Sequence, residues 1–407
     1  MSWPSPVLGF PIEGVFGMRH RMLLITEVIA PYRIPVCNAL AKKDDVDLHV
    51  IFLAETHPTL RKWLIYKDEI RFSYEVLRSW RGSIRGYQVL LNWGLWSALS
   101  RWSPDIIICG GYNYLASWQA GLWARIHGVP FVLWCESNLN DRRKGHVPVE
   151  FLKRLFLKGC DGFVVPGTAS FAYLRAFGVP EGTISIAPNA VDNELFARAA
   201  DVARRNGAAL RRSLNLPPRY FLYVGRLVRE KGVFDLLEAY GRLEDKLRSE
   251  VGLVLAGDGP ALPELLERAA RIAPGEVRCA GFVQRDALSS YYALAEALVF
   301  PTLSDPWGLV VNEAMACGLP VIGSRAAGCV PDLVCDQWNG YVVSPGDIQR
   351  MAWAMATLAG QAELVKTMGA RSADRVFRNS PAACASGLAA AAARISRRLE
   401  ACTNTTQ

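Results

Sequence analysis

Short apolar runs alternate with amphipathic stretches along the first half of the chain. The apolar runs are rich in Val, Ile, Leu and Phe, which is typical of buried strands. We predict strands at 22–26, 47–53, 105–109, 130–134 and 162–165. The stretches that lie between or after them predict helices at 34–42, 115–127, 149–158 and 169–177. Strands that alternate with helices indicate a parallel sheet covered on both faces.

The second half repeats this alternation with sharper boundaries. Apolar runs predict strands at 220–224, 251–256, 277–280, 298–300 and 320–323. Between the first two runs, apolar residues recur at i, i+3, i+4 and i+7 of a helix, namely Val233, Leu236, Leu237 and Tyr240. A short helix predicted at 310–317 ends at Gly318 and Pro320.

The boundaries between these units follow shifts in composition. Residues 197–219 combine charge with Gly207, Pro217 and Pro218, which indicates a connection between two domains. The predicted organisation is an N-terminal extension at 1–21, a Rossmann-like domain at 22–196, a linker at 197–217, a second Rossmann-like domain at 218–378, and a C-terminal helix and tail at 379–407. The fold class is therefore α/β, with two doubly wound domains facing each other across a cleft. Ligands of such sheets bind beyond the carboxyl ends of the strands.

Composition favours a folded cytoplasmic protein. Of the 407 residues, 51% are apolar and 21% are charged, which supports a sizeable core and excludes a disordered chain. The ten cysteines are scattered without a C-x-x-C pair, so we expect reduced thiols and a cytoplasmic location. The longest uncharged run, 106–124, contains Gly110-Gly111-Tyr112-Asn113, so a strand, a turn and a helix explain it better than a membrane span.

The net charge of +8 is spread over the chain, with 22 Lys and Arg against 17 Asp and Glu before residue 201 and 24 against 21 after it. A nucleic-acid surface would need denser positive charge, so we expect no nucleic-acid partner. One local group mixes arginine with tryptophan, namely Arg78, Arg81, Arg85, Trp80, Trp93 and Trp96. Such a mixture occurs where proteins contact a membrane surface peripherally, here the inner leaflet. A solvated loop beside a core helix is the alternative.

The loop from Gly225 to Gly232 directly follows a predicted strand and opens a helix. A basic loop flanked by glycines at a helix N-terminus can bind an anion. Arg226 can hold a phosphate through two parallel hydrogen bonds, and Lys231 adds a compact positive charge. A charged surface loop is the alternative, but the position at a strand's carboxyl end favours the anion site.

Two more turns follow the next strands. Gly257, in the turn Gly257-Asp258-Gly259-Pro260, would let the backbone approach a flat ligand, although alone it indicates only a tight turn. Phe282 comes directly after a predicted strand and Gly281, where it could present its ring and backbone to a base. A core position for this phenylalanine is the alternative.

An acidic segment surrounds the start of the helix predicted at 310–317. Asp305 lies in the preceding loop and Glu313 about one turn into the helix. Free backbone N–H groups near Gly308, Leu309 and Val310 can hold a phosphate. A carboxylate can accept hydrogen bonds from two vicinal hydroxyls, so Glu313 suits a hydroxyl-rich ligand. Taken singly, Asp305 is equally consistent with a turn residue and Glu313 with a solvated one.

These segments, in this order, make the second half similar to glycosyltransferase family 4, a family of retaining transferases with the two-domain GT-B architecture. The matching stretches are 223–232, 255–260, 281–282 and 301–324. In the first half, Pro31-Tyr32-Arg33-Ile34-Pro35 and Pro188-Asn189-Ala190-Val191-Asp192 also resemble the family. The family pairs two glutamates separated by seven residues, whereas here the first acid is Asp305.

The resemblance implies that the second domain holds a nucleotide-sugar donor and the first a saccharide or lipid-linked acceptor. Glu313 would bind the ribose, Arg226 and Lys231 would neutralise the diphosphate, and Asp305 would contact the sugar. Further donor contacts are expected at Gly225, Gly257, Phe282, Gly308, Leu309 and Val310. No Asp-x-Asp motif or carboxylate cluster accompanies the phosphate loop, so we expect no metal and no cofactor.

The first half departs from the family pattern after the strand predicted at 130–134. Many relatives have a histidine there, but this chain continues with Cys135-Glu136-Ser137-Asn138. Glu136 could contact the donor sugar or the acceptor, or act as a base toward the acceptor hydroxyl. Capping of the next turn is an equally good interpretation. Further candidates on the acceptor side are Arg33, Asn113 and Asn189, with local turn and surface roles as alternatives.

The sequence therefore favours a retaining, metal-independent glycosyltransferase of polysaccharide or glycolipid biosynthesis. A first alternative is a non-catalytic nucleotide-sugar-binding subunit that regulates a partner transferase, consistent with Asp305 and the missing histidine. A second is a GT-B sugar-nucleotide epimerase, which the absence of an obvious histidine base disfavours.

Overall fold

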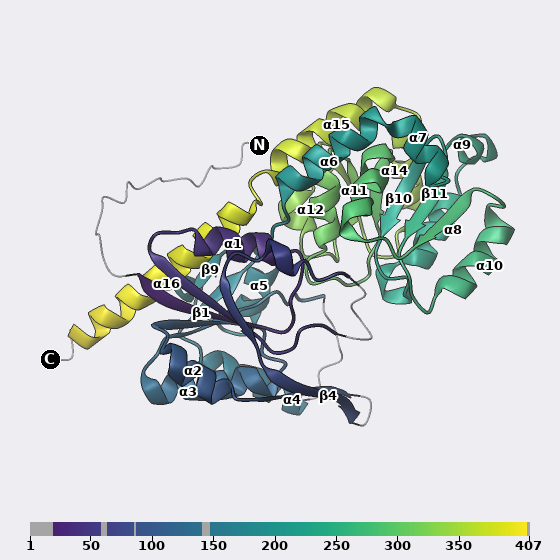
Figure 1. Ribbon diagram of the computed structural model, residues 1–407. Helices are drawn as coiled ribbons and strands as arrows, with labels where there is room; N and C mark the ends of the chain where they lie inside the picture. Colours follow the sequence, from purple (N-terminus) through teal and green to yellow (C-terminus); the bar gives the residue numbers. More distant parts are fainter. Residues whose placement is uncertain (1–18, 58–62, 85–86, 141–146, 405–407) are drawn as a thin grey trace.

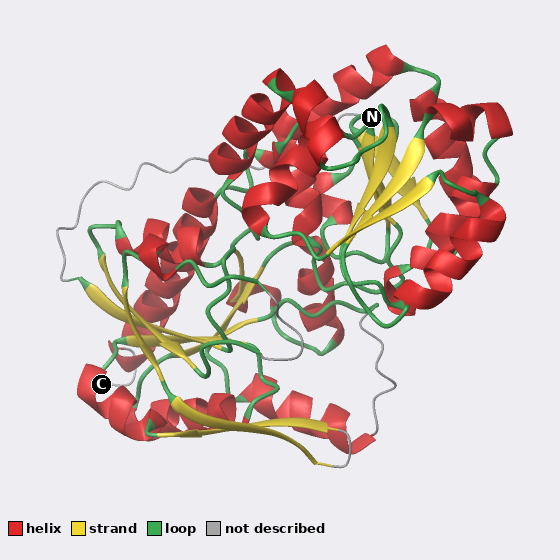
Figure 2. Cartoon of the chain, turned by 45° about the vertical axis from the view of Figure 1, so that its right-hand side comes forward, coloured by secondary structure: helices red, strands yellow, loops and turns green. Residues whose placement is uncertain are grey.

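The protein is built from two α/β domains that lie next to each other (Figure 1). The structure is a computed structural model that describes residues 19–57, 63–84, 87–140 and 147–404. The predicted two-domain α/β class is confirmed, since each domain contains one parallel sheet flanked by helices (Figure 2). Most of the predicted extension at 1–21 lies outside the described residues, and the first strand begins at His20.

The first domain contains a seven-stranded parallel sheet in the order β3-β2-β1-β6-β7-β8-β9. Its strands are β1 (His20–Thr26), β2 (Val46–Phe52), β3 (Ser73–Val76), β6 (Ile106–Gly110), β7 (Phe131–Trp134), β8 (Gly162–Val165) and β9 (Ile184–Ile186). Its helices are α1 (Ile34–Ala41), α2 (Leu95–Trp102), α3 (Leu115–His127), α4 (Val147–Lys158) and α5 (Thr168–Ala176), with 3-10 turns at Lys67–Glu69 and Glu181–Thr183. The strand order reverses between β1 and β6, which is the switch point where doubly wound sheets bind ligands.

Alternation along β1 shows how the sheet separates two cores. Met22 and Leu24 belong to the cluster on one face, which also contains residues of α1. Leu23 and Ile25 belong to the cluster on the other face, under α2 and α3. Successive strand side chains point to opposite faces, so a strand covered on both sides must be apolar at every position.

The second domain repeats the plan with six parallel strands in the order β12-β11-β10-β13-β14-β15. Its strands are β10 (Tyr220–Val224), β11 (Gly252–Ala256), β12 (Val277–Gly281), β13 (Ala297–Phe300), β14 (Val321–Ser324) and β15 (Gly340–Val343). Its helices are α8 (Val233–Gly241), α9 (Asp245–Glu250), α10 (Leu262–Ile272), α11 (Arg285–Leu294), α12 (Leu309–Ala316), α13 (Val330–Leu333), α14 (Ile348–Ala359) and α15 (Ala362–Val376), with a 3-10 turn at Arg229–Lys231. Here the switch point lies between β10 and β13, so the loops after these two strands adjoin.

The segment predicted as a linker at 197–217 is helical and belongs to the second domain. It is formed by α6 (Asn193–Arg205) and α7 (Gly207–Ser213). Phe196, Ala200 and Ala203 are buried with residues of α11 and α12 in the core of that domain. The charge that suggested a linker lies on the solvent side of α6, for example at Arg205, so composition concealed an amphipathic helix.

The C-terminal helix α16 (Pro381–Asn404) returns from the second domain to the first (Figure 1). Cys384, Ala385 and Leu388 are fully buried against α1 and the first sheet. Helix α16 can approach β8 closely because Gly162 lacks a side chain. A Cβ at this position would lie 2.3 Å from the side chain of Ile395. The chain therefore crosses between the domains twice, once before α6 and once before α16.

The arginine and tryptophan region forms an antiparallel hairpin, not the solvated loop offered as an alternative. The hairpin pairs β4 (Arg78–Ile84) with β5 (Tyr87–Trp93). Arg81 points inward and donates to Glu27, with a 3.1 Å separation between Nη2 and Oε1. Trp80 and Trp93 are exposed on the opposite face. Across the described part of the chain, no helix combines the length and apolar character needed to cross a membrane.

We predict that Leu388→Ala lowers the free energy of unfolding by about 2–5 kcal/mol, because it empties a fully buried position between α16 and the first domain. Urea unfolding followed by tryptophan fluorescence measures this change. The control is Arg397→Ala on the exposed side of the same helix, which we expect to be nearly neutral. Equal effects of the two substitutions would contradict the packing role of α16.

Candidate functional site

The two loops at the switch point of the second sheet are joined by a salt bridge. Lys231, after β10, places Nζ 2.5 Å from Oδ2 of Asp305, after β13, and 3.0 Å from the carbonyl oxygen of Ser304. The side chains of Lys231 and Asp305 are only 15% and 18% exposed. Two residues that the sequence placed at a donor site, 74 positions apart, therefore meet.

Glycines allow the loops after β10 and β11 to touch. A Cβ at Gly257 would lie 1.8 Å from the carbonyl oxygen of Gly225, so no larger residue fits. The backbone N–H of Leu227 donates to the carbonyl of Asp258 at 2.9 Å. Gly257 therefore allows the close approach of the loop from Gly225 to Gly232. A direct contact of Gly225 or Gly257 with the donor stays a prediction. Arg226 is exposed at the tip of this loop.

The N-terminus of α12 lies next to the salt bridge. Gly308 has a φ of +100°, and a Cβ there would lie 2.6 Å from the ring of Phe300, so glycine is required on both counts. Asp305 Oδ1 accepts a hydrogen bond from the N–H of Trp307 at 3.1 Å. Leu309 and Val310 begin the helix and are partly exposed. Their orphan N–H groups suit an anion.

Glu313 lies on α12 and accepts a hydrogen bond from the buried hydroxyl of Tyr292, with 2.7 Å between the oxygens. Desolvation raises the pKa of Glu313 to about 7, although the hydrogen bond from Tyr292 and the charge of Arg285 act in the opposite direction. The interpretation of Glu313 as a fully solvated residue is therefore wrong. Tyr292 was missed because it reads as one more apolar position of α11.

Phe282 is 44% exposed, directly after β12, so the alternative of a core position is wrong. Gly281 before it has a φ of +70°, which turns the chain sharply at the strand end. The exposed ring lies at the carboxyl edge of the sheet, and its contact with a base stays a prediction.

In the first domain, three candidates from distant segments form one cluster. Oε1 of Glu136, after β7, accepts hydrogen bonds from Arg33 and from Nδ2 of Asn189, the latter at 3.2 Å. Nη1 of Arg33 also donates to Oδ1 of Asn189 at 3.3 Å. The Arg33 guanidinium lies 3.8 Å from the ring centre of Trp134, a cation–π contact. Asn113 is exposed beyond β6 and makes no hydrogen bond to these three side chains.

Several hydrogen bonds join this region to the second domain. Nδ2 of Asn138 donates to the backbone oxygen of Asp305 at 2.8 Å, and Nδ2 of Asn312 donates to the backbone oxygen of Asn189 at 3.1 Å. Asp332 accepts from the N–H of Thr168, at the start of α5, at 3.0 Å. The sequence showed Asn138 beside Glu136 but offered no signal for its role, because its partner is 167 positions away.

A second contact between the domains joins residues 64–69 to the start of α11. Arg285, at the start of α11, forms a salt bridge with Glu69 of the first domain, with 2.9 Å between Nη1 and Oε2. Its guanidinium also lies 3.6 Å from the ring centre of Tyr66. Oε1 of Gln284 accepts from the N–H of Leu64 at 3.1 Å. This contact therefore bridges the domains at the start of α11, three residues after Phe282, and the charge of Arg285 also acts on the carboxyl of Glu313.

Within the described ranges, no three His, Cys, Asp or Glu side chains gather as metal ligands would. Independence from metals stays a prediction. The nine cysteines from Cys37 to Cys384 are free thiols, and a cytoplasmic location stays a prediction.

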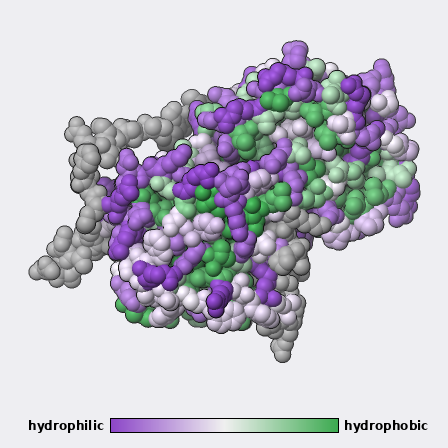
Figure 3. Space-filling model, viewed as in Figure 1, coloured by the Kyte–Doolittle hydropathy of each residue, from purple (hydrophilic) through white to green (hydrophobic). Residues whose placement is uncertain are grey.

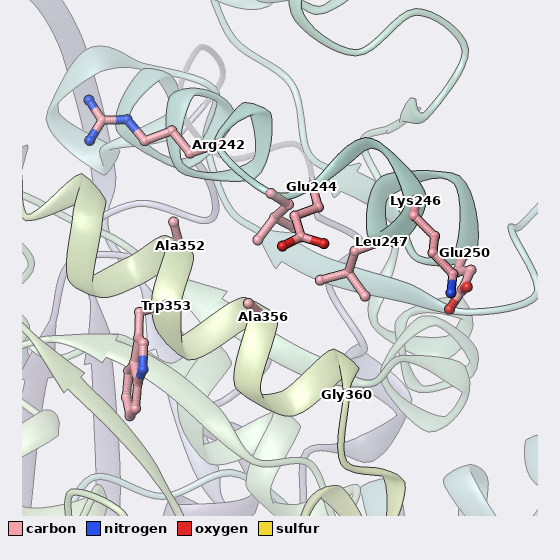
Figure 4. A pocket seen from close by; sticks show the side chains of 10 residues that line it. Arg242, Glu244, Lys246, Leu247, Glu250, Ala352, Trp353, Ala356 and Gly360 are labelled. Carbon is pink, nitrogen blue, oxygen red and sulfur yellow. The ribbon is translucent and has the colours of Figure 1, made fainter.

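A hollow of about 530 Å³ lies elsewhere, between α9 and α14 of the second domain (Figure 4). Leu247 and Trp353 contribute apolar surface, while Arg242 and Lys246 are balanced by Glu244 and Glu250. None of the predicted site residues lines this hollow, so it is not part of the candidate site.

The fold and the arrangement of the two switch-point loops define a two-domain GT-B protein. Residues 36–195 match the family described as Glycosyltransferase Family 4, and residues 209–375 match Glycosyl transferases group 1. The chain belongs to this group 1 / family 4 glycosyltransferase family.

Curated relatives have varied activities. The sulfoquinovosyl transferase SQD2 of Arabidopsis thaliana is 28% identical over 67% of this chain and 53% of its own length. A D-inositol 3-phosphate glycosyltransferase of Streptomyces bingchenggensis is 28% identical over 81% of this chain and 72% of its own. An alpha-D-kanosaminyltransferase of Streptomyces kanamyceticus is 34% identical over 62% of this chain and 57% of its own length. The chain spans about half the length of several curated relatives that it matches, as for SQD2.

Solved structures agree with the fold over almost the whole chain. The HepE protein of Anabaena, in complex with UDP and glucose, gives a TM-score of 0.71 at 17% identity and covers 91% of this chain and 98% of its own. Sucrose-phosphate synthase from Thermosynechococcus elongatus gives a TM-score of 0.70 at 20% identity and covers 94% of this chain and 100% of its own. At this identity the likeness supports the fold alone.

We predict that Glu69→Gln loosens the contact between the domains, because it removes the charge that faces Arg285. Hydrogen–deuterium exchange should become several-fold faster in residues 63–71 and at the start of α11. Glu363→Gln, which removes an exposed partner of Lys366 within α15, is the control. Unchanged exchange in residues 63–71 would show that the salt bridge does not hold the domains together.

Proposed function

We propose that the protein transfers a sugar from a nucleotide-sugar donor to a saccharide or lipid-linked acceptor, with retention of the anomeric configuration and without a metal ion. The observation that carries this proposal is the joining of Lys231, Asp305 and the N-terminus of α12 at the switch point of the second sheet. This arrangement offers positive charge and backbone N–H groups to a diphosphate beside a carboxylate suited to a sugar.

The donor is held by the second domain. Arg226 and Lys231 bind the diphosphate together with the backbone of Leu309 and Val310, and Glu313 accepts the ribose hydroxyls. As the diphosphate leaves, negative charge develops on its oxygens, and these fixed groups stabilise that charge without reorganising. Lys231 is already held by Asp305, so its ammonium is positioned before the donor arrives.

Asp305 and Glu136 face the reacting sugar from the two domains. Asp305 binds sugar hydroxyls with the carboxylate that also holds Lys231. Glu136 contacts the sugar or the acceptor, and Arg33 and Asn189 position its carboxylate through their shared hydrogen bonds to Oε1. Arg33, Asn113 and Asn189 form the proposed acceptor side, which is supported by their common location on the first domain.

The activities of related proteins support the proposed chemistry. SQD2 and the D-inositol 3-phosphate glycosyltransferase are named as transferases, and the HepE structure contains UDP and glucose. These names support a nucleotide-sugar donor for this protein and a role in glycolipid or polysaccharide synthesis.

The test is a screen of the purified protein against UDP-, GDP-, ADP- and dTDP-sugars. Its two readouts are the thermal shift of the protein and the release of nucleoside diphosphate. We expect one donor to stabilise the protein, Glu313→Gln to weaken that stabilisation and Lys231→Met to lose it. The matched controls are Glu363→Gln and Lys366→Met, an exposed pair on α15. If no nucleotide sugar binds, the proposed donor site is wrong.

We predict that Lys231→Met lowers kcat for diphosphate release at least ~100-fold, because the departing diphosphate loses a fixed positive charge. Steady-state kinetics with the donor from the screen measures this effect, and NMR of the product tests retention. Donor binding without turnover, even with candidate acceptors present, would favour the regulatory subunit over the transferase.

We predict that donor affinity falls at acidic pH. The pKa of Glu313 is raised to about 7, so this carboxyl becomes protonated and neutral as the pH falls through neutrality. Between about pH 8 and pH 6 its ionised fraction, and with it the affinity, should drop about tenfold. Isothermal titration across this range measures the dependence. Glu313→Gln should flatten it, and a slope that survives this substitution would assign the titration to another group.

A further inference from the structure

Helix α4 presents apolar side chains to solvent. Phe151 is 67% exposed, and Leu152 and Leu155 on the same helix are about half exposed. The helix already has a core side, because Phe156 and Leu157 are buried among residues of the first domain. The outward residues are therefore additional apolar surface that the fold itself does not use.

The neighbouring elements extend this surface. Helix α3 packs against α4 through an edge contact between Trp118 and Phe156, with ring centres 4.9 Å apart. The hairpin β4–β5 lies along the same edge of the first domain as α2, α3 and α4 (Figure 1). Large exposed apolar side chains on these neighbours are Leu115, Leu122, Ile126, Trp80, Trp93 and Trp96. In Figure 3 the lower edge has small hydrophobic areas at its left end and is otherwise close to neutral, with some hydrophilic side chains.

The charges on these elements have almost one sign. The five elements α2, α3, α4, β4 and β5 carry seven basic side chains, namely Arg78, Arg81, Arg101, Arg125, Lys153, Arg154 and Lys158. Glu150 is the only acidic residue on these elements, and it pairs with Lys153 at 3.3 Å. Arg81 and Arg101 are paired with Glu27 and Glu75 of neighbouring segments. The exposed positive charges on these elements are therefore Arg78, Arg125, Arg154 and Lys158. We call the outward sides of α3, α4 and the hairpin the basic apolar face.

We infer that the basic apolar face docks on the surface of an anionic phospholipid bilayer. Apolar side chains and tryptophan can enter the boundary between headgroups and acyl chains, while Arg and Lys beside them attract anionic headgroups. A second copy of the chain is a poorer fit, because two faces of the same positive charge would repel each other. The contact is peripheral and does not depend on the proposed donor or acceptor.

The first experiment is flotation of the full chain with vesicles of phosphatidylcholine alone or with an equal part of phosphatidylglycerol. We expect binding to the anionic vesicles that weakens as salt is raised. Phe151→Ser combined with Leu155→Ser should reduce the partition coefficient roughly tenfold. Arg125→Gln with Arg154→Gln should reduce it about 25-fold at low salt.

Matched controls come from exposed positions of the second domain. Phe377→Ser removes a phenylalanine that is 64% exposed, and Arg242→Gln with Arg271→Gln removes two surface charges. These variants should bind vesicles like the unaltered chain. Absence of vesicle binding, or equal loss in the controls, would overturn the inference.

Sedimentation equilibrium tests whether a second copy of the chain, and not a bilayer, covers the basic apolar face. A dimer that Phe151→Ser with Leu155→Ser converts to monomers, without vesicle binding by the unaltered chain, would assign the face to a second copy and overturn the membrane inference. Thermal shift with the nucleotide sugar, measured without vesicles, reports the donor site separately. Its failure would count against the proposed function, whereas failure of flotation alone would count against the membrane contact.

Discussion

The candidate site depends on the salt bridge between Lys231 and Asp305. It connects the loops after β10 and β13, and its two charges are largely removed from water. Loss of either partner would leave an uncompensated charge in a poorly hydrated place, which is costly. The carboxylate of Asp305 also accepts a hydrogen bond from the N–H of Trp307 near the start of α12. Its backbone oxygen accepts one from Asn138 of the first domain. The loop from Gly225 to Gly232, the N-terminus of α12 and a contact between the domains thus share one anchor.

Polar contacts hold the domains together where a transferase would bring donor and acceptor into contact. Asp332 accepts from the first turn of α5, where the helix dipole favours negative charge, and Arg285 reaches Glu69. Such contacts exchange readily with water, so they suit domains that open for substrate and close around it. The apolar packing of α6 and α16, in contrast, keeps the two chain crossings fixed.

The proposed membrane face and the proposed acceptor side belong to the same domain. The basic apolar face follows α3, α4 and the hairpin, while Arg33, Glu136 and Asn189 lie at the carboxyl ends of the first sheet. A lipid-linked acceptor in the bilayer would therefore meet the domain that is proposed to bind it. The second domain, with the donor loops, remains accessible to a nucleotide sugar from solution.

The sequence by itself determined the parallel sheets, the basic loop from Gly225 to Gly232 and the acidic segment around α12. Apolar periodicity, glycine spacing and strand ends are local signals. It also showed the basic and tryptophan-rich composition of the hairpin but not its strands, and it concealed α6 behind charged residues. Only the tertiary structure decided that Arg33 and Asn189 meet at Glu136, that Tyr292 hydrogen-bonds to Glu313 and that Asn138 reaches Asp305. These partners lie far apart in sequence or on different elements. Their pairing depends on how whole layers pack, and no local pattern of residues records that packing.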